Sequence, residues 1–233
     1  MISKVSYSFR RALTRFAFTV LLTLSVRVIA QQAAVATIGF TCDFPGSVPS
    51  HYEISMASDG QGSYFSQTKP ANPGTETADS SDNDYRGTFT LPPSTVARIF
   101  DLAKKSDYFA GEIDSKKRIA STGRKTLSYH SSSRNVQASY DYSAVKTVQD
   151  LTSMFQGLSE SLEFVHRLSY DLQYQKLALD DELKRMEEMA SRGTLPQVSV
   201  AGPVLAKIAN DSAIMNVSRA RAQRLLAASE AHK

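Results

Sequence analysis

The chain has 233 residues, of which 42% are hydrophobic and 21% charged, with one cysteine and no tryptophan. This composition excludes a collagen-like or wholly disordered protein, and only the N-terminus is apolar enough to interact with a bilayer, which excludes a polytopic membrane protein. Residues 1–30 contain five basic residues and no acidic one, so the remainder has 22 basic and 23 acidic residues and a net charge of −1 instead of +4. We therefore expect no nucleic-acid partner.

Residues 1–30 have the pattern of a secretory signal peptide. Four basic residues precede an apolar segment, residues 16–26, that is shorter than the roughly 20 residues needed to cross a bilayer. Val28 and Ala30 stand at the −3 and −1 positions of a cleavage site, so cleavage is predicted between Ala30 and Gln31. We expect export from a bacterial cell, to the periplasm or beyond, with no membrane contact after cleavage. An uncleaved N-terminal membrane anchor is the alternative.

The segment of residues 31–50 is predicted to be an irregular lead-in, because its residues are small or polar and Pro45, Gly46 and Pro49 interrupt it. It contains the single cysteine, Cys42. One thiol cannot form an internal disulfide, so burial alone must hold the fold together. A buried or unreactive thiol is a simpler interpretation of Cys42 than an intermolecular disulfide.

The next segment predicts short strands. In residues 51–57, Tyr52, Ile54 and Met56 alternate with polar residues, and residues 62–67 continue the pattern after Asp59-Gly60. Aspartate-glycine between two alternating runs indicates a β-hairpin, because glycine adopts positive φ at no steric cost. A polar, acidic loop over residues 68–84 and a further strand over 85–91 follow.

Helices become more frequent further along the chain. Pro93 opens a predicted helix with an apolar stripe at i, i+3, i+4 and i+7, and residues 124–130 and 135–140 predict a second hairpin. A long amphipathic helix starts at Val148. Residues 168–174 alternate, so a strand is the alternative there, but the strong helix formers that follow favour a helix that ends at Gly193. Two short helices begin near Pro203 and Asn216.

The predicted fold class is therefore α+β. A small antiparallel sheet of hairpins, packed on one or two helices, occupies residues 51–168. An all-helical C-terminal extension occupies residues 169–233.

This order of elements resembles that of a known family. Residues 52–55 (Tyr-Glu-Ile-Ser) precede Asp59-Gly60, residues 85–87 (Tyr-Arg-Gly) open a strand, and Pro93 opens a helix that is followed by Phe109, a hairpin and a further helix. Over about residues 48–168 the chain resembles a domain-of-unknown-function family of secreted bacterial proteins. The helical remainder is similar to tails of acidobacterial hypothetical proteins. The resemblance implies a fold and an export route but no activity.

Two sets of side chains are candidates for chemistry. Ser143 and Lys146 form an S-x-x-K pattern, and residues 81–83 read Ser-Asp-Asn, as in penicillin-recognising enzymes, but no K-T-G follows and the order is reversed. Tyr129 and Tyr140, near the second hairpin, are candidates for binding a glycan or a peptide. The four histidines are scattered, and no cofactor or metal motif is present, so no cofactor is predicted.

The leading interpretation is a non-enzymatic, exported periplasmic or envelope protein of the binding type. Its expected partner is an envelope protein or a glycan. A serine-based envelope hydrolase that uses Ser143 and Lys146 is the alternative from another class, and a membrane-tethered protein with an uncleaved N-terminal helix is the third.

Overall fold

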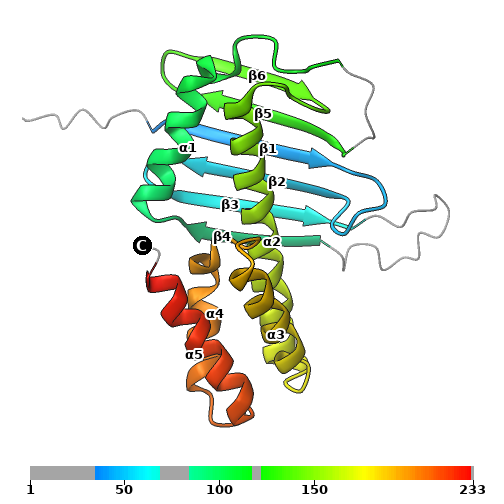
Figure 1. The fold of residues 1–233 in the computed structure, drawn as a ribbon, viewed down its shortest axis with the longest axis vertical. Coiled ribbons are helices and arrows are strands. Elements are labelled where there is room, and N and C mark those ends of the chain that lie inside the picture. The colour runs from blue at the N-terminus through cyan, green and yellow to red at the C-terminus, as the bar shows by residue number, and fades with distance from the viewer. Residues whose placement is uncertain (1–34, 69–83, 117–121, 232–233) are drawn as a thin grey trace, which may run out of the picture. The chain divides into compact units, whose positions relative to one another are not determined.

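A six-stranded antiparallel sheet with the order β4-β3-β2-β1-β5-β6 lies at the centre of the structure (Figure 1). The computed structural model describes residues 35–68, 84–116 and 122–231. The strands are β1 (Thr37–Asp43), β2 (His51–Ala57), β3 (Gln61–Gln67), β4 (Asp84–Thr90), β5 (Arg124–His130) and β6 (Asn135–Tyr140). The α-helices are α1 (Pro93–Lys105), α2 (Lys146–Tyr174), α3 (Leu179–Ser191), α4 (Gly202–Asn210) and α5 (Asn216–Ala231), and the short 3-10 helices are η2 (Asp107–Phe109) and η3 (Val198–Ala201).

Both predicted hairpins are present. β2 pairs with β3 through a turn in which Gly60 has a φ of +89°, the left-handed conformation that favours glycine. β5 pairs with β6, with Leu127 opposite Ala138. The local turn signals in the sequence were therefore sufficient to place four of the six strands.

The expectation of an irregular lead-in over residues 31–50 is wrong for residues 37–43, which form β1. This strand lies between β2 and β5, so it joins the two hairpins into one sheet. Ile38 and Phe40 are fully buried, with exposed fractions of 0% and 1%. The physical reason is that β1 is stabilised by partners distant in sequence on both sides, whereas the prolines and glycine that suggested a loop begin only after Asp43.

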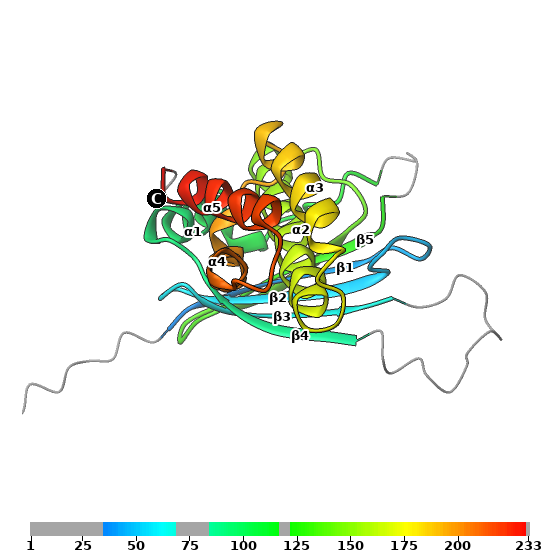
Figure 2. The same ribbon diagram turned by 90° about the horizontal axis from the view of Figure 1, so that it is seen from below.

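Helices α1 and α2 cover one face of the sheet, and the other face carries no described helix (Figure 2). Apolar side chains from the covered face meet the two helices in one core. Phe40 of β1 and Phe155 of α2, for example, stack with ring centroids 5.1 Å apart. The α+β class is therefore confirmed.

The C-terminal helices form a second core around the far half of α2. This helix passes the boundary expected at residue 168 without a break and ends at Tyr174. Phe164 and Leu168, in its second half, pack with side chains of α3, α4 and α5 beyond the β4 edge of the sheet (Figure 1). The described residues, which hold both cores, belong to one compact unit. In the described ranges, no helix combines the length and apolar character needed to cross a membrane.

Candidate functional site: the open face of the sheet

The face of the sheet without helices is polar. Successive side chains in a strand point to opposite faces of the sheet. Every second side chain is buried against the helices, and those between them, mainly serine, threonine and charged residues, point to the other face. We call this surface the open face. A shallow cavity on it is lined mainly by Thr37, Gly39, Thr41, Glu53, Ser55, Ser63, Phe65, Arg86, Thr88, Ser128 and His130.

One row of small residues crosses the open face perpendicular to the strands. The strand register places Thr88, Ser63, Ser55, Gly39 and Ser128 opposite one another in succession, from β4 to β5. We call this row the hydroxyl trough. With about 4.8 Å between neighbouring strands, these five strands span about 19 Å.

Gly39 has no side chain, and this leaves the middle of the hydroxyl trough unfilled. A Cβ atom at this position would lie 2.4 Å from Ser128 Oγ, which is closer than real Cβ contacts come. Any side chain at residue 39 would therefore displace Ser128 or fill the trough. The cavity has a volume of about 700 Å³, which lies in the range of small-molecule binding sites.

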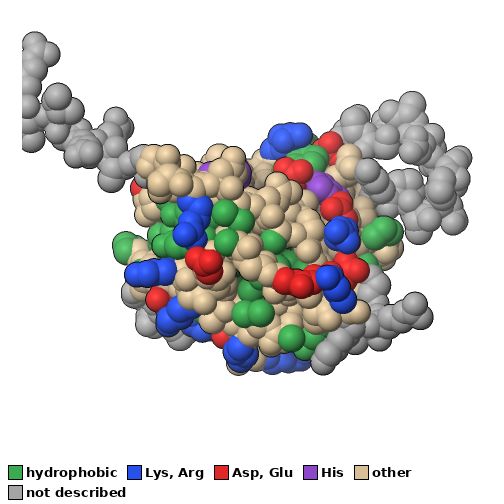
Figure 3. Space-filling view, turned by 90° about the horizontal axis from the view of Figure 1, so that it is seen from above, with side chains coloured by type: hydrophobic (Ala, Val, Ile, Leu, Met, Phe, Trp, Pro, Cys, Tyr) green, Lys and Arg blue, Asp and Glu red, His purple; other side chains and the backbone are tan. Residues whose placement is uncertain are grey.

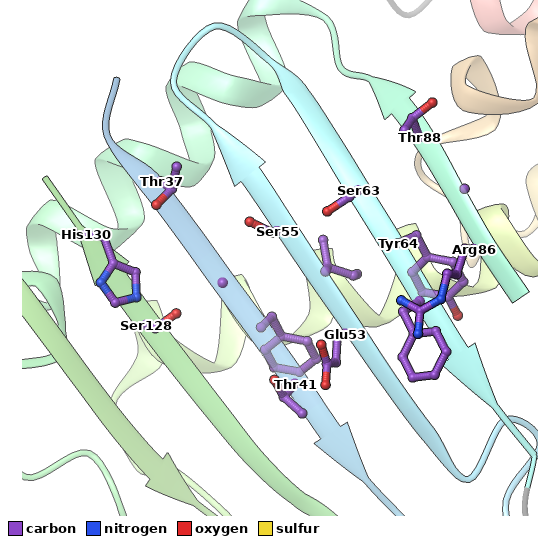
Figure 4. Close-up of a pocket in the computed structure, with 15 residues that line it drawn as sticks. Thr37, Thr41, Glu53, Ser55, Ser63, Tyr64, Arg86, Thr88, Ser128 and His130 are labelled. Carbon is purple, nitrogen blue, oxygen red and sulfur yellow. The ribbon is translucent and has the colours of Figure 1, made fainter. Parts of the chain in front are cut away.

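Charged side chains stand beside the hydroxyl groups (Figure 4). Arg86 of β4 lies over the ring of Phe65 with its guanidinium carbon 4.0 Å from the ring centroid, a cation–π contact that holds the guanidinium group in place. His51 contacts Asp43 through Nδ1 at 2.6 Å and Glu53 through Nε2 at 3.1 Å. These contacts orient the Glu53 carboxylate, which lines the cavity.

A buried polar network lies under the trough, between β3 and α2. The Tyr64 hydroxyl donates a hydrogen bond to Glu163 Oε1 at 2.8 Å, and Ser66 Oγ donates to the same oxygen at 2.7 Å. His166 Nδ1 lies 3.9 Å from the other oxygen of Glu163, and the His166 ring stacks on Tyr85 at a centroid distance of 4.2 Å. This network fixes α2 to the strands that form one half of the trough.

The network controls the ionisation of Glu163. Burial on its own would raise the pKa of this carboxyl group, but His166 and the hydrogen bonds from Ser66 and Tyr64 outweigh burial and hold the pKa below its ordinary value of 4.5. Burial in turn raises the pKa of Tyr64, so this phenol stays protonated and can donate its hydrogen bond. The group under the sheet is therefore a carboxylate with two hydroxyl donors.

The two residues of the alternative hydrolase hypothesis, Ser143 and Lys146, have different surroundings. Ser143 is buried at 2% exposure, and its Oγ accepts a hydrogen bond from the backbone N–H of Val145 at 3.2 Å. Helix α2 begins only at Lys146, whose ammonium group is exposed and pairs with Asp150. Ser143 and Lys146 therefore do not lie on one helical turn, which S-x-x-K chemistry requires. The Ser-Asp-Asn pattern at residues 81–83 lies outside the described residues.

The two tyrosines proposed as a binding surface lie on the helix-covered side. Tyr140 is buried at 2% exposure and contacts the hydroxyl group of Thr152 in α2 at 2.5 Å. Tyr129 packs on Tyr108 with ring centroids 4.4 Å apart, beside the left-handed turn of residues 107–109. Neither side chain lines the open face.

Cys42 is buried in the first core and faces neither solvent nor the trough. Burial raises the pKa of its thiol above the ordinary range, which keeps it protonated and unreactive. Its cross-strand neighbour Lys125 is buried too, and the ammonium group donates hydrogen bonds to the carbonyl oxygens of Gly123 at 2.7 Å and Asp141 at 3.1 Å. Cys42 and Lys125 are therefore structural residues of the β1–β5 pair.

On the face seen in Figure 3, basic and acidic side chains lie interspersed. Within the described ranges, no group of three histidine, cysteine or acidic residues is arranged to hold a metal ion. The polar cavity on the open face is the candidate binding site to which the strand register points.

The sequence contains a signal for this site in the alternation of its strand residues, although tyrosines are predicted as the binding residues instead. In residues 61–67, the outward-facing Ser63 and Phe65 alternate with the inward-facing Tyr64 and Ser66, and residues 37–41 alternate between the two faces in the same way. Alternation predicts that such side chains share a face, but only the pairing of distant strands brings them into one trough.

No protein-family model matches the chain, and no curated protein matches it. The similarity to a family of secreted bacterial proteins thus stays a prediction from short motifs.

Proposed function

We propose that the protein is a non-enzymatic, exported binding protein that holds an oligosaccharide in the hydroxyl trough. The observation that carries the proposal is the row of Thr88, Ser63, Ser55, Gly39 and Ser128 on a sheet face without helices. Serine and threonine hydroxyl groups both donate and accept hydrogen bonds, as sugar hydroxyl groups do.

The charged neighbours of the trough favour a glycan over a peptide. Arg86 offers fixed donors and Glu53 fixed acceptors, the pairing that suits neighbouring hydroxyl groups of a sugar. The cavity offers few apolar side chains, with the face of the Phe65 ring already covered by Arg86. A peptide that relies on apolar anchors would find little to bury there.

The test uses a substitution that fills the trough without touching the core. Ser55 is exposed at the centre of the row, so Ser55→Phe places a ring over Gly39 and leaves the buried face unchanged. Gln137→Phe is the matched control, because Gln137 continues the same row on β6 but does not line the cavity. Binding is measured by isothermal titration with chitotetraose, cellotetraose, maltotetraose and glycan strands released from peptidoglycan.

We expect one of these glycans to bind saturably and Ser55→Phe to weaken it at least tenfold, which corresponds to about 1.4 kcal/mol. The Gln137→Phe control should bind as the original chain does. No saturable binding by any of the four, or equal binding by both variants, would contradict the proposal.

Export is the second part of the proposal. Its support is the basic and apolar pattern of residues 1–30, which lie outside the described residues. N-terminal sequencing of envelope protein is expected to begin at Gln31. Retention of residues 1–30 would favour the membrane-tethered form instead.

A further inference from the structure

A second cavity lies on the other side of the molecule, where α1 meets the C-terminal helices. Its volume is about 780 Å³, slightly larger than that of the cavity on the open face. It is lined by the start of α1, the end of α3, the segment of residues 193–199 and the end of α5. We call it the interhelical groove. It lies between elements of the two hydrophobic cores, and the junction of packed units is a common place for small-molecule sites.

The floor of the interhelical groove is apolar. Leu195 and Leu225 are buried at 2% exposure each, and Val198 at 9%. Ala190 and Ala228 also line it, and their small side chains leave the groove open. An apolar body of ligand would therefore be removed from water along this floor.

The charges that line the groove favour an anion. Two basic residues, Arg98 and Arg224, and one acidic residue, Glu187, line the groove. Both oxygens of Glu187 are already engaged, one by Arg224 Nε at 2.8 Å and the other by Arg221 Nη1 at 2.7 Å. Arg98 has no ion-pair partner among the residues that the structure describes. The groove thus combines an apolar floor with a guanidinium group that is available to a ligand.

We infer that the interhelical groove binds a small amphipathic anion, with its apolar body on Leu195 and Leu225 and its carboxylate at Arg98. Guanidinium and carboxylate groups match in geometry and form charge-assisted hydrogen bonds. The ligand would contact α1 and the C-terminal helices together. The inference is independent of glycan binding on the open face.

The experiment titrates the full chain with laurate and with 2-naphthoate, which present the same carboxylate on a flexible and on a planar apolar body. Ala228→Trp fills the groove from an exposed position of α5, and Ala227→Trp, which does not line it, is the control. Arg98→Gln removes the available charge, and Arg192→Gln is the control on an exposed arginine outside the groove.

At least one of the two anions is expected to bind saturably, and the tighter of the two identifies the apolar body. Ala228→Trp should abolish this binding, and Arg98→Gln should weaken it about fivefold, or about 1 kcal/mol. Neither control variant should change it. Absence of saturable binding, or binding that Arg98→Gln leaves unchanged, would overturn the inference. If circular dichroism shows that Ala228→Trp does not fold, the Arg98→Gln variant alone decides the test.

Discussion

Replacing Glu163 tests whether the buried network fixes α2 to the sheet. Glu163→Gln keeps the size of the side chain and an oxygen that accepts a hydrogen bond, but it removes the negative charge. Tyr64 and Ser66 both donate to this carboxylate, at 2.8 and 2.7 Å. A hydrogen bond to a charged group contributes about 1 kcal/mol more than one between neutral groups, so losing the charge at two bonds should cost about 2 kcal/mol.

The pH dependence of this loss follows from the direction of the pKa shift. The pKa of Glu163 is lower in the folded state than its ordinary value of 4.5. A lowered pKa means that the carboxylate stabilises the fold fully above pH 4.5, and that the contribution disappears as the pH falls through the folded-state pKa. The difference in stability between Glu163→Gln and the original chain should therefore be largest near neutral pH and shrink in acid.

Urea titrations from pH 7 downward measure this difference, followed by circular dichroism for as long as the original chain remains folded. Glu188→Gln is the control, because Glu188 is exposed on α3 and its pair with Arg192 at 3.7 Å is a surface pair. Its effect should stay within about 0.5 kcal/mol at every pH. A Glu163→Gln loss that is the same in acid as at neutral pH would refute the assignment of a buried carboxylate to the network.

A truncation and further substitutions test the packing of the two cores. A chain that begins at residue 48 lacks β1 and should show no cooperative thermal unfolding. A chain that begins at residue 35 keeps β1 and should unfold cooperatively. Cooperative unfolding of the shorter chain would show that β1 is dispensable. Leu183→Asp, fully buried in the second core, should lose about 2–4 kcal/mol in urea titrations. The control at its exposed neighbour, Lys184→Asp, should change little, and equal losses would disprove the burial of this helix face. Cys42→Ser should fold with about 1–3 kcal/mol less stability, and a covalent dimer of the original chain on a non-reducing gel would contradict the burial of its thiol.

The elements that could be predicted from the sequence are those with local signals. Asp59-Gly60 places the first hairpin, Pro93 the start of α1, and the three- and four-residue spacing from Val148 the long helix. Strand β1 has only an alternating run of seven residues, and its stability comes from β2 and β5, its neighbours in space. Local propensity cannot supply that information.

The candidate site was harder to predict for a related reason. The frequency of tyrosine suggested Tyr129 and Tyr140 as binding residues, yet Tyr140, like Tyr64, is an inward-facing member of its strand. Their outward neighbours are small residues such as Ser63 and Ser139, which have no distinctive pattern of their own. The trough exists only because the register of separate strands aligns such residues, and which face the helices cover is decided by tertiary packing.

Nuclear magnetic resonance provides the most direct test of binding on the open face. Backbone amide shifts are recorded for the chain while the glycan that binds best in the titrations is added. The largest shift changes are expected at Gly39, Ser55, Ser63 and Ser128, with little change at α3 and α5. Shift changes confined to the helices, or spread evenly over the molecule, would contradict a glycan site in the hydroxyl trough.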